Sequence, residues 1–218
     1  MLLVCGLAFE ARIAAGPGVR VVRGPGPLRT ARQLDAVLSS GAAAGILSFG
    51  CAGALDPALG AGACVVATAV QAGAALVATD PAWTRALLGH LPQAQAGLLA
   101  GLDAPLVTRA AKARLWQAGG ALAVDMESHA AALAARRHGL PFAACRVVLD
   151  PAWRSLPACA LAAMREDGGT DIVALLRALA GAPAQIVPLT ALALDAWRAR
   201  RALAGVRACL GPAVVPPR

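Results

Sequence analysis

Short apolar runs alternate with helical patterns along most of this 218-residue chain, and this alternation limits the possible folds more than any other feature. The runs are rich in Val, Ile, Leu and Ala, which is typical of strands buried on both faces of a parallel sheet. The segments between them carry apolar residues at helical spacing. We therefore expect an α/β fold in which a mixed, mostly parallel central sheet is flanked by helices. The expected strands cover residues 2–5, 45–49, 63–69, 121–124 and 142–149, and the expected helices cover residues 28–38, 81–88, 108–116 and 127–137.

The chain is long enough for one sizeable core, and no charged run or Ser/Gly-rich linker divides it. We therefore expect a single domain over residues 1–210. After residue 150 the pattern becomes helical, at residues 172–180 and 189–203, and these segments should pack across the sheet. Residues 211–218 contain three prolines, which predicts a loosely held C-terminal tail.

The hydrophobic content of 58% and the mean hydropathy of +0.64 raise the question of a membrane span. Residues 60–79 carry no charge and are long enough to cross a bilayer. Glycines at positions 60, 62 and 73 interrupt this stretch, however, so buried strands explain it better. Residues 1–9 lack the basic start of a signal peptide and predict a first strand. The expected location is therefore the cytoplasm.

Six scattered cysteines form neither a C-x-x-C pair nor a cluster with histidine, so we expect no zinc site and no disulfide framework. The net charge of +8 raises the question of a nucleic-acid partner. The arginines are spread along the chain and there is no Tyr for base stacking, so nucleic acid is not expected. Peripheral contact with an anionic membrane remains open.

Candidate site residues follow several of the expected strands, and ligands of open α/β folds bind outside the carboxyl ends of strands. Glu10 lies in a loop after the first strand, and a turn with Gly50 and Gly53 follows residues 45–49. The acids Asp125 and Glu127 follow another strand. A glycine turn lets backbone N–H groups approach an anion or a sugar hydroxyl, although many such turns only reverse the chain. Motifs for nucleoside triphosphates or dinucleotides are absent from the sequence.

The two acids at the start of the expected helix 127–137 suit different roles. Asp125 is placed to cap the helix. Glu127 then remains available to a ligand, although the helix dipole also favours an acid there. Its two oxygens suit the neighbouring hydroxyls of a ribose, and Met126 could supply apolar contact to the sugar.

Asp150 ends the apolar run 142–149 and precedes Pro151, which is a common turn combination. Its position also predicts partial burial, and burial raises a carboxyl pKa. A carboxylic acid that is still protonated near neutral pH can protonate a leaving group. Asp150 is therefore a candidate general acid.

These motifs resemble those of the nucleoside phosphorylase and nucleosidase superfamily, and within it the hopanoid-associated phosphorylases. The Met-Glu element, at its spacing from the aspartate that ends the next strand, is typical of the superfamily, and the Asp-Met-Glu-Ser-His spelling is typical of the hopanoid branch. The resemblance runs over most of the chain. Its segments are residues 6–12 (GLAFEAR), 48–57 (SFGCAGALDP), 123–129 (AVDMESH), 140–142 (LPF) and 146–152 (RVVLDPA).

The resemblance implies cleavage of the bond between a purine base and ribose through an oxocarbenium-like transition state. Asp150 and Glu10 would be the catalytic residues, with Asp150 protonating the purine and Glu10 beside the nucleophile. Met126 and Glu127 would bind ribose. The other implied substrate-binding positions are Gly50, Cys51, Gly53 and Arg146 near the nucleophile, and Leu106 and Val107 near the base.

Two positions depart from the family pattern around Asp150. Leu149 replaces a serine, and Trp153 replaces a second aspartate. Both changes remove polar neighbours that could orient Asp150 or share its proton. The sequence therefore leaves open reduced activity, or a substrate contact rebuilt around Trp153. At Cys51, a thiol replaces a better hydroxyl donor.

The implied reaction is release of adenine from adenosylhopane, which gives a ribosyl or phosphoribosyl hopane for membrane lipid synthesis. No cofactor or metal is expected, and inorganic phosphate would be a co-substrate if it replaces water as the acceptor. The expected partners are a small-molecule, lipid-linked nucleoside and a second copy of the chain in a homodimer. The alternatives are a 5′-methylthioadenosine/S-adenosylhomocysteine nucleosidase, a catalytically weakened nucleoside-binding protein, and a basic scaffold at the membrane surface.

Overall fold

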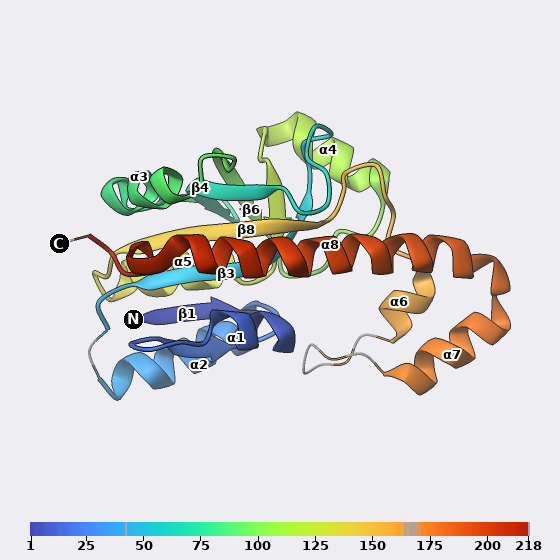
Figure 1. Ribbon diagram of the computed structural model, residues 1–218, viewed down its shortest axis with the longest axis horizontal. Helices are drawn as coiled ribbons and strands as arrows, with labels where there is room; N and C mark the ends of the chain where they lie inside the picture. Colours follow the sequence, from blue (N-terminus) through green and yellow to red (C-terminus); the bar gives the residue numbers. More distant parts are fainter. Residues whose placement is uncertain (42, 164, 166–168, 170, 218) are drawn as a thin grey trace.

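A single eight-stranded sheet forms the centre of the molecule (Figure 1). The computed structural model describes residues 1–41, 43–163, 165, 169 and 171–217. The strands are β1 (Leu2–Cys5), β2 (Arg20–Arg23), β3 (Ile46–Ala54), β4 (Cys64–Ala72), β5 (Ala75–Ala78), β6 (Gln95–Gly101), β7 (Ala123–Asp125) and β8 (Phe142–Asp150). Their order is β2-β1-β3-β7-β6-β4-β5, and β8 pairs with both β3 and β4.

Five of these strands close into a ring. β3 pairs with β8, β8 with β4, β4 with β6, β6 with β7, and β7 again with β3. Most pairs are parallel, and the antiparallel ones are β3–β7, β4–β5 and β4–β8. The predicted mixed, mostly parallel sheet is confirmed, whereas its closure was not anticipated. Because β3 and β8 are parallel, Gly53 lies directly opposite Asp150 where both strands end.

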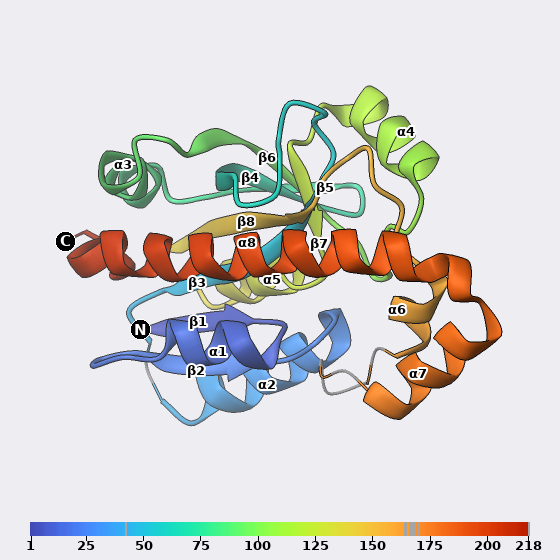
Figure 2. The same cartoon turned by 45° about the vertical axis from the view of Figure 1, so that its right-hand side comes forward.

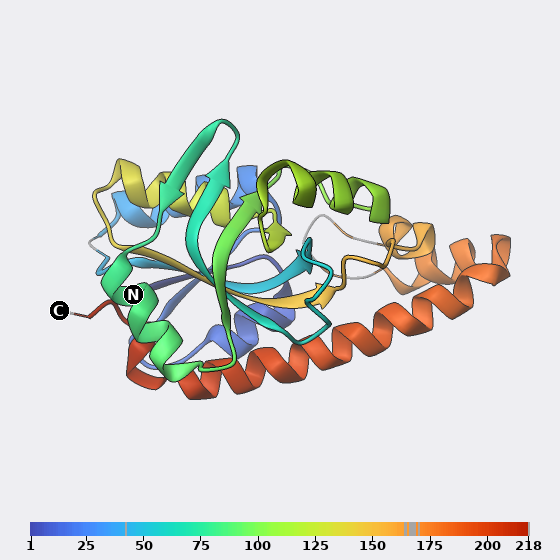
Figure 3. The ribbon, with the colours of Figure 1, turned by 90° about the horizontal axis from the view of Figure 1, so that it is seen from above.

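Helices cover both sides of the sheet (Figure 3). Leu34 of α2 and the alanines of α5 pack into one core layer, while Trp83 of α3 and Leu203 of α8 pack into the other. The apolar faces that the sequence predicts thus lie against the sheet. The helices are α1 (Ala8–Ala14), α2 (Pro27–Ser39), α3 (Pro81–His90), α4 (Arg109–Gly119), α5 (Ser128–Arg137), α6 (Ala158–Ala162), α7 (Ile172–Gly181) and α8 (Ile186–Leu210), with 3-10 turns η1 (Pro183–Gln185) and η2 (Gly211–Val214).

Two local predictions about candidate site residues are wrong. Glu10 lies in helix α1 and not in a loop. The segment with Gly50 and Gly53 is part of strand β3, not a turn, because its backbone continues to pair with β8. The sequence also did not indicate β2, β5, β6, α1 or α6.

The C-terminal helices divide into a packed part and a projecting part (Figure 2). From Asp195 onward α8 packs on the body, with Ala199, Leu203 and Leu210 fully buried. Between residues 172 and 194 no residue is buried, so the prediction that this region packs across the sheet holds only for the second half of α8. Within the predicted loose tail, Val214 is buried in the core, so this part is packed; Arg218 lies outside the described residues.

The uncharged stretch 60–79 contains β4 and β5, so the prediction that it forms strands and not a membrane span is confirmed. Among the described helices, none by itself has the length and apolar character needed to cross a membrane. The pair made of Ile172–Gly181 and Pro183–Leu210 meets that test jointly, with a bend of 119°.

The division of α8 predicts unequal effects of the same substitution. Leu203→Ala removes a fully buried side chain and should lower the free energy of unfolding by about 2–5 kcal/mol. Leu194→Ala, at a residue that is 58% exposed, should change it by no more than about 0.5 kcal/mol. Urea unfolding measures both, and equal losses would contradict this packing.

Candidate active site

A cavity of about 260 Å³ lies where β1, β3, β7 and β8 end. It brings together residues that are far apart in the sequence, among them the carboxylates of four acidic residues. Of the residues singled out in the sequence, those lining it are Glu10, Cys51, Gly53, Leu106, Asp125, Met126, Glu127, Leu149 and Asp150. Gly50 and Arg146 lie behind this lining, and Val107 lies outside it with its carbonyl accepting from the Leu156 N–H at 2.9 Å.

Glu10 is held by three backbone N–H groups. Its Oε2 accepts from Gly6 and Leu7 at 2.9 and 2.8 Å, and its Oε1 accepts from Cys51 at 2.8 Å. Burial raises the pKa of Glu10, while Arg146 and these three N–H groups act in the opposite direction. A Cβ on Gly50 would lie 2.7 Å from Arg146 Nη1 and 2.8 Å from Glu10 Oε2, so only glycine allows this approach.

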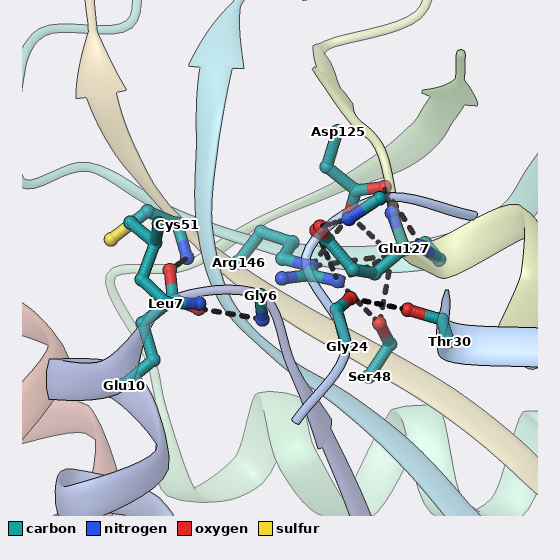
Figure 4. A network of polar contacts seen from close by, with 12 residues as sticks. Gly6, Leu7, Glu10, Gly24, Thr30, Ser48, Cys51, Asp125, Glu127 and Arg146 are labelled. Carbon is teal, nitrogen blue, oxygen red and sulfur yellow. Dashed lines mark hydrogen bonds and ion pairs between the residues drawn. The ribbon is translucent and has the colours of Figure 1, made fainter. Parts of the chain in front are cut away.

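Arg146 is the buried centre of the polar network in Figure 4. Its Nε lies 2.6 Å from Asp125 Oδ2, and its Nη2 lies 3.9 Å from Glu127 Oε2. The guanidinium also donates to the hydroxyls of Ser48 and Ser128. Nη1 has no hydrogen-bond acceptor among the described residues. One guanidinium thus offsets the negative charge of several carboxylates.

Asp125 and Glu127 make different contacts at the start of α5. Asp125 Oδ1 accepts from the backbone N–H groups of Glu127 and Ser128 at 3.2 and 2.9 Å, so it stabilises the start of α5 as predicted, although the N-cap position is Glu127. The side chain of Glu127 makes no capping bond and instead accepts from the Gly26 N–H at 3.0 Å. Burial raises the pKa of Glu127 to about 7, opposed by Arg146 and reinforced by Asp125 and Glu10.

The backbone also lies close to the carboxylates of Glu127 and Asp150. A Cβ on Gly6 would lie 2.7 Å from Glu127 Oε1, and one on Gly53 would lie 3.1 Å from Asp150 Oδ1. Thr30 donates to the carbonyl of Gly24 at 2.5 Å and so fixes the segment that presents the Gly26 N–H (Figure 4). The walls near Glu127 and Asp150 are therefore largely main chain.

Asp150 forms a buried ion pair with Lys112 of α4. The Lys112 ammonium is fully buried and also donates to the carbonyls of Pro151 and Arg154 at 3.1 and 3.0 Å. Burial raises the pKa of the Asp150 carboxyl, and the Lys112 charge counters part of that rise. Lys112 therefore holds both the side chain of Asp150 and the loop that follows it.

Lys112 supplies the polar neighbour that Leu149 and Trp153 remove from the family pattern. Leu149 lines the cavity, whereas Trp153 is 50% exposed and lies outside the lining. Sequence reasoning missed Lys112, although a signal existed: it is the only lysine in a chain with many arginines. A lysine kept amid such arginine usage indicates a need for a compact ammonium.

Cys51 faces the cavity as a neutral thiol. Burial, together with the neighbouring Glu10 charge, raises the pKa of the Cys51 thiol well above its ordinary value. A thiolate nucleophile therefore does not form here at neutral pH.

One wall of the cavity is apolar and comes from the C-terminal region. The sequence did not single out these residues, because nothing in their spacing places α6 and α8 beside the strand ends. The wall consists of Leu156, Ala160, Leu161 and Leu192.

The family model of the phosphorylase superfamily matches residues 6–179, which is most of the chain. The chain belongs to the phosphorylase superfamily. The enzyme class expected from the motifs is thereby shown, and the matched range contains all four acidic residues that line the cavity. No curated protein matches the sequence of this phosphorylase-superfamily enzyme.

Solved structures share the fold of this superfamily enzyme. Futalosine hydrolase of Helicobacter pylori strain 26695 is 15% identical with a TM-score of 0.63, over 83% of this chain and 96% of that chain. S-adenosylhomocysteine nucleosidase from Streptococcus pyogenes, in complex with 5-methylthiotubericidin, is 18% identical with a TM-score of 0.64, over 94% of both chains. 5′-Methylthioadenosine/S-adenosylhomocysteine nucleosidase from Helicobacter pylori, with butyl-thio-DADMe-Immucillin-A, is 13% identical with a TM-score of 0.68, over 98% and 96%.

The Lys112–Asp150 pair predicts a change in pH dependence. Lys112→Met removes the charge that opposes the rise in the pKa of Asp150, so this pKa moves further up. If protonated Asp150 is the acid, the alkaline limb of kcat/KM for nucleoside cleavage shifts to higher pH. Lys112→Arg keeps the charge and should keep the limb near its original position. An unmoved limb in a folded Lys112→Met variant would show that another group sets it.

Proposed function

We propose that this chain cleaves the N-glycosidic bond of a purine nucleoside. The observation that carries the proposal is the cavity, whose lining includes Glu127 with Met126, Asp150 and Glu10. These carboxylates suit a sugar that becomes positively charged as its bond to the base breaks. The superfamily match supports the same reaction class.

Glu127 binds the ribose in this proposal. Its carboxylate lines the cavity, makes no capping bond, and is held by the Gly26 N–H and the Arg146 charge. Two acceptor oxygens suit two neighbouring hydroxyl donors. Met126, beside it in the lining, packs against the sugar.

Asp150 serves as the general acid toward the departing base. The proton passes from its carboxyl to the purine ring while the bond between the ring nitrogen and ribose C1 breaks. The base then leaves neutral, which general acid catalysis of this kind favours by about a hundredfold to ten-thousandfold. Leu106 lies in the lining and contacts the base, whereas Lys112 positions Asp150 from outside the cavity.

Water is the acceptor that the cavity favours. Within the described part of the chain, no arginine or lysine lines the cavity, while a phosphate dianion would need cationic partners. In this proposal Glu10 orients a water molecule and accepts its proton as the bond to ribose C1 forms. Arg146 Nη1, which lies close to Gly50, is a further hydrogen-bond donor. Hydrolysis then yields the free ribosyl product and the base.

The proposed substrate is adenosylhopane, whose adenine would be released to give ribosylhopane. The Asp-Met-Glu-Ser-His run supports this choice, and the apolar wall of Leu156, Ala160, Leu161 and Leu192 suits a substrate that is greasy beyond its ribose. A homodimer in the cytoplasm, in peripheral contact with the membrane that carries the lipid, completes the proposal.

Two other functions have specific support. Several proteins with a similar structure are 5′-methylthioadenosine/S-adenosylhomocysteine nucleosidases, which favours a soluble nucleoside as substrate. The ion pair on Asp150 favours a catalytically weakened binding protein, because an ammonium stabilises the ionised form of the carboxyl. Turnover, and its substrate range, separate these possibilities.

The central test is adenine release, measured by chromatography with adenosylhopane and with 5′-methylthioadenosine, each with and without phosphate. We expect phosphate-independent release from adenosylhopane, and loss of at least about a hundredfold in kcat in Asp150→Asn. Asp35→Asn, on the exposed face of α2, is the matched control. Adenine release that depends on phosphate would show that phosphate, not water, is the acceptor. Binding of the nucleoside without turnover would show a nucleoside-binding protein and not an enzyme.

The raised pKa of Glu127 predicts a pH-dependent KM. As the pH falls through about 7, Glu127 becomes protonated and loses acceptor capacity, so KM for the nucleoside should rise. Glu127→Gln should have a high KM that no longer varies over this range. Initial rates on either side of pH 7 measure both, and a wild-type KM that is flat there would argue against Glu127 as the ribose ligand.

A further inference from the structure

The segment from residue 172 to residue 194, which we call the apolar hairpin, stands away from the sheet (Figure 1). It comprises α7, η1 and the first part of α8. Its single charged residue is Arg177, and none of its residues is buried. Exposed apolar surface of this extent is unusual on a protein surface and marks a contact with another body. Its large exposed side chains are Ile172, Val173, Leu176, Ile186, Val187 and Leu194.

On α8 the exposed positions form one stripe that changes character along the helix. Val187 is 75% exposed and Leu194, seven residues on, is 58% exposed. Trp197 follows, and Arg198 and Arg201 continue the same side of the helix at helical spacing. The Arg201 guanidinium lies 5.7 Å from the centre of the Trp197 ring. Along this stripe, hydrocarbon is followed by an indole and then by cations.

A bilayer presents its partners in the same order. Hydrocarbon tails meet aliphatic side chains, the interfacial region accommodates Trp, and lipid phosphates attract Arg. Aspartate and glutamate are absent between residues 172 and 194, and the chain carries a net charge of +8. The charge therefore complements an anionic surface.

We propose that the apolar hairpin docks this enzyme onto an anionic lipid bilayer. α7 and the Val187–Leu194 side of α8 lie in the interface, and Arg198 and Arg201 contact lipid phosphates. α8 is inclined to the surface, so that its Val187–Leu194 part lies deeper in the interface than Trp197, Arg198 and Arg201. The second half of α8 stays packed on the sheet.

The opposite side of the same helix lines the cavity. Leu192 lies five residues after Val187 and therefore on the far side of α8, and it belongs to the cavity's apolar wall. The cavity is thus separated from the docking side by one helix. A lipid-linked nucleoside could therefore enter the cavity without its tail crossing water. This route rests on the proposed function, whereas docking on the bilayer rests only on the apolar hairpin.

Flotation of the full chain with vesicles tests the docking. We expect binding to phosphatidylcholine vesicles that contain phosphatidylglycerol, weaker binding to phosphatidylcholine alone, and further weakening by salt. Val187→Glu with Leu194→Glu should lower the partition coefficient at least about tenfold. Leu76→Glu, at a residue 64% exposed on β5, is the matched control and should bind as wild type.

The arginines are tested separately. Arg198→Gln with Arg201→Gln should weaken binding to the anionic vesicles by about fivefold for each arginine. Arg85→Gln with Arg114→Gln, at exposed positions on α3 and α4, is the control for net charge. Equal weakening in both pairs would overturn the proposed contact and indicate general attraction of a basic protein.

The remaining outcomes separate this inference from the proposed function. Lipid docking would be overturned if the wild-type protein did not float with the vesicles. If it instead self-associated without binding vesicles, and Val187→Glu with Leu194→Glu abolished this self-association, the hairpin would be a contact with a second copy of the chain. Vesicle binding without nucleoside cleavage would instead sink the proposed function alone. Melting curves confirm that each variant is folded, and cleavage of soluble nucleosides should be unchanged in the glutamate variants.

Discussion

The buried guanidinium of Arg146 is the interaction on which the rest of the site depends. Asp125, Glu127 and Glu10 could not remain together in a closed cavity if their charges were not offset, because burial penalises each carboxylate. Removing one member of a buried ion pair typically costs about 3–5 kcal/mol. Ser48 and Ser128 accept from its Nε and Nη2, so the guanidinium is held by groups from two strands and a helix, while Nη1 has no acceptor among the described residues. A rigid cation of this kind lets several acids face one small space.

The ring of strands explains why that space exists at all. β3 contributes to pairs on both sides, and its extension to Ala54 carries Cys51 and Gly53 past the point where β1 ends. Glycines at positions 50 and 53 then let side chains from α1 and β8 approach its backbone. The cavity therefore depends on the length of β3 and on glycines that lack a Cβ, and the residues that line it come from widely separated parts of the chain.

The architecture and much of the cavity lining were predictable from the sequence. Buried strands appear as short apolar runs between helical patterns, and several acidic residues directly follow such runs. Asp125 could be recognised as a cap since capping is a local interaction. Closure of the sheet could not be predicted, because β6 is a weak apolar run and strand pairing is a long-range property. Continuation of β3 through Gly50 was likewise hidden, since glycine usually indicates a turn. Lys112 and Asp150 are 38 residues apart, and no local pattern connects them.

The solitary lysine has a further consequence. Apart from the chain's own N-terminus, Lys112 is the only amine in the molecule, and it is fully buried against Asp150. A nitrogen-labelled sample would therefore show a single side-chain ammonium resonance, sheltered from exchange, whose frequency follows the proton shared across that pair. The enzyme thus carries its own spectroscopic reporter beside Asp150, and no probe group has to be attached to the side chain.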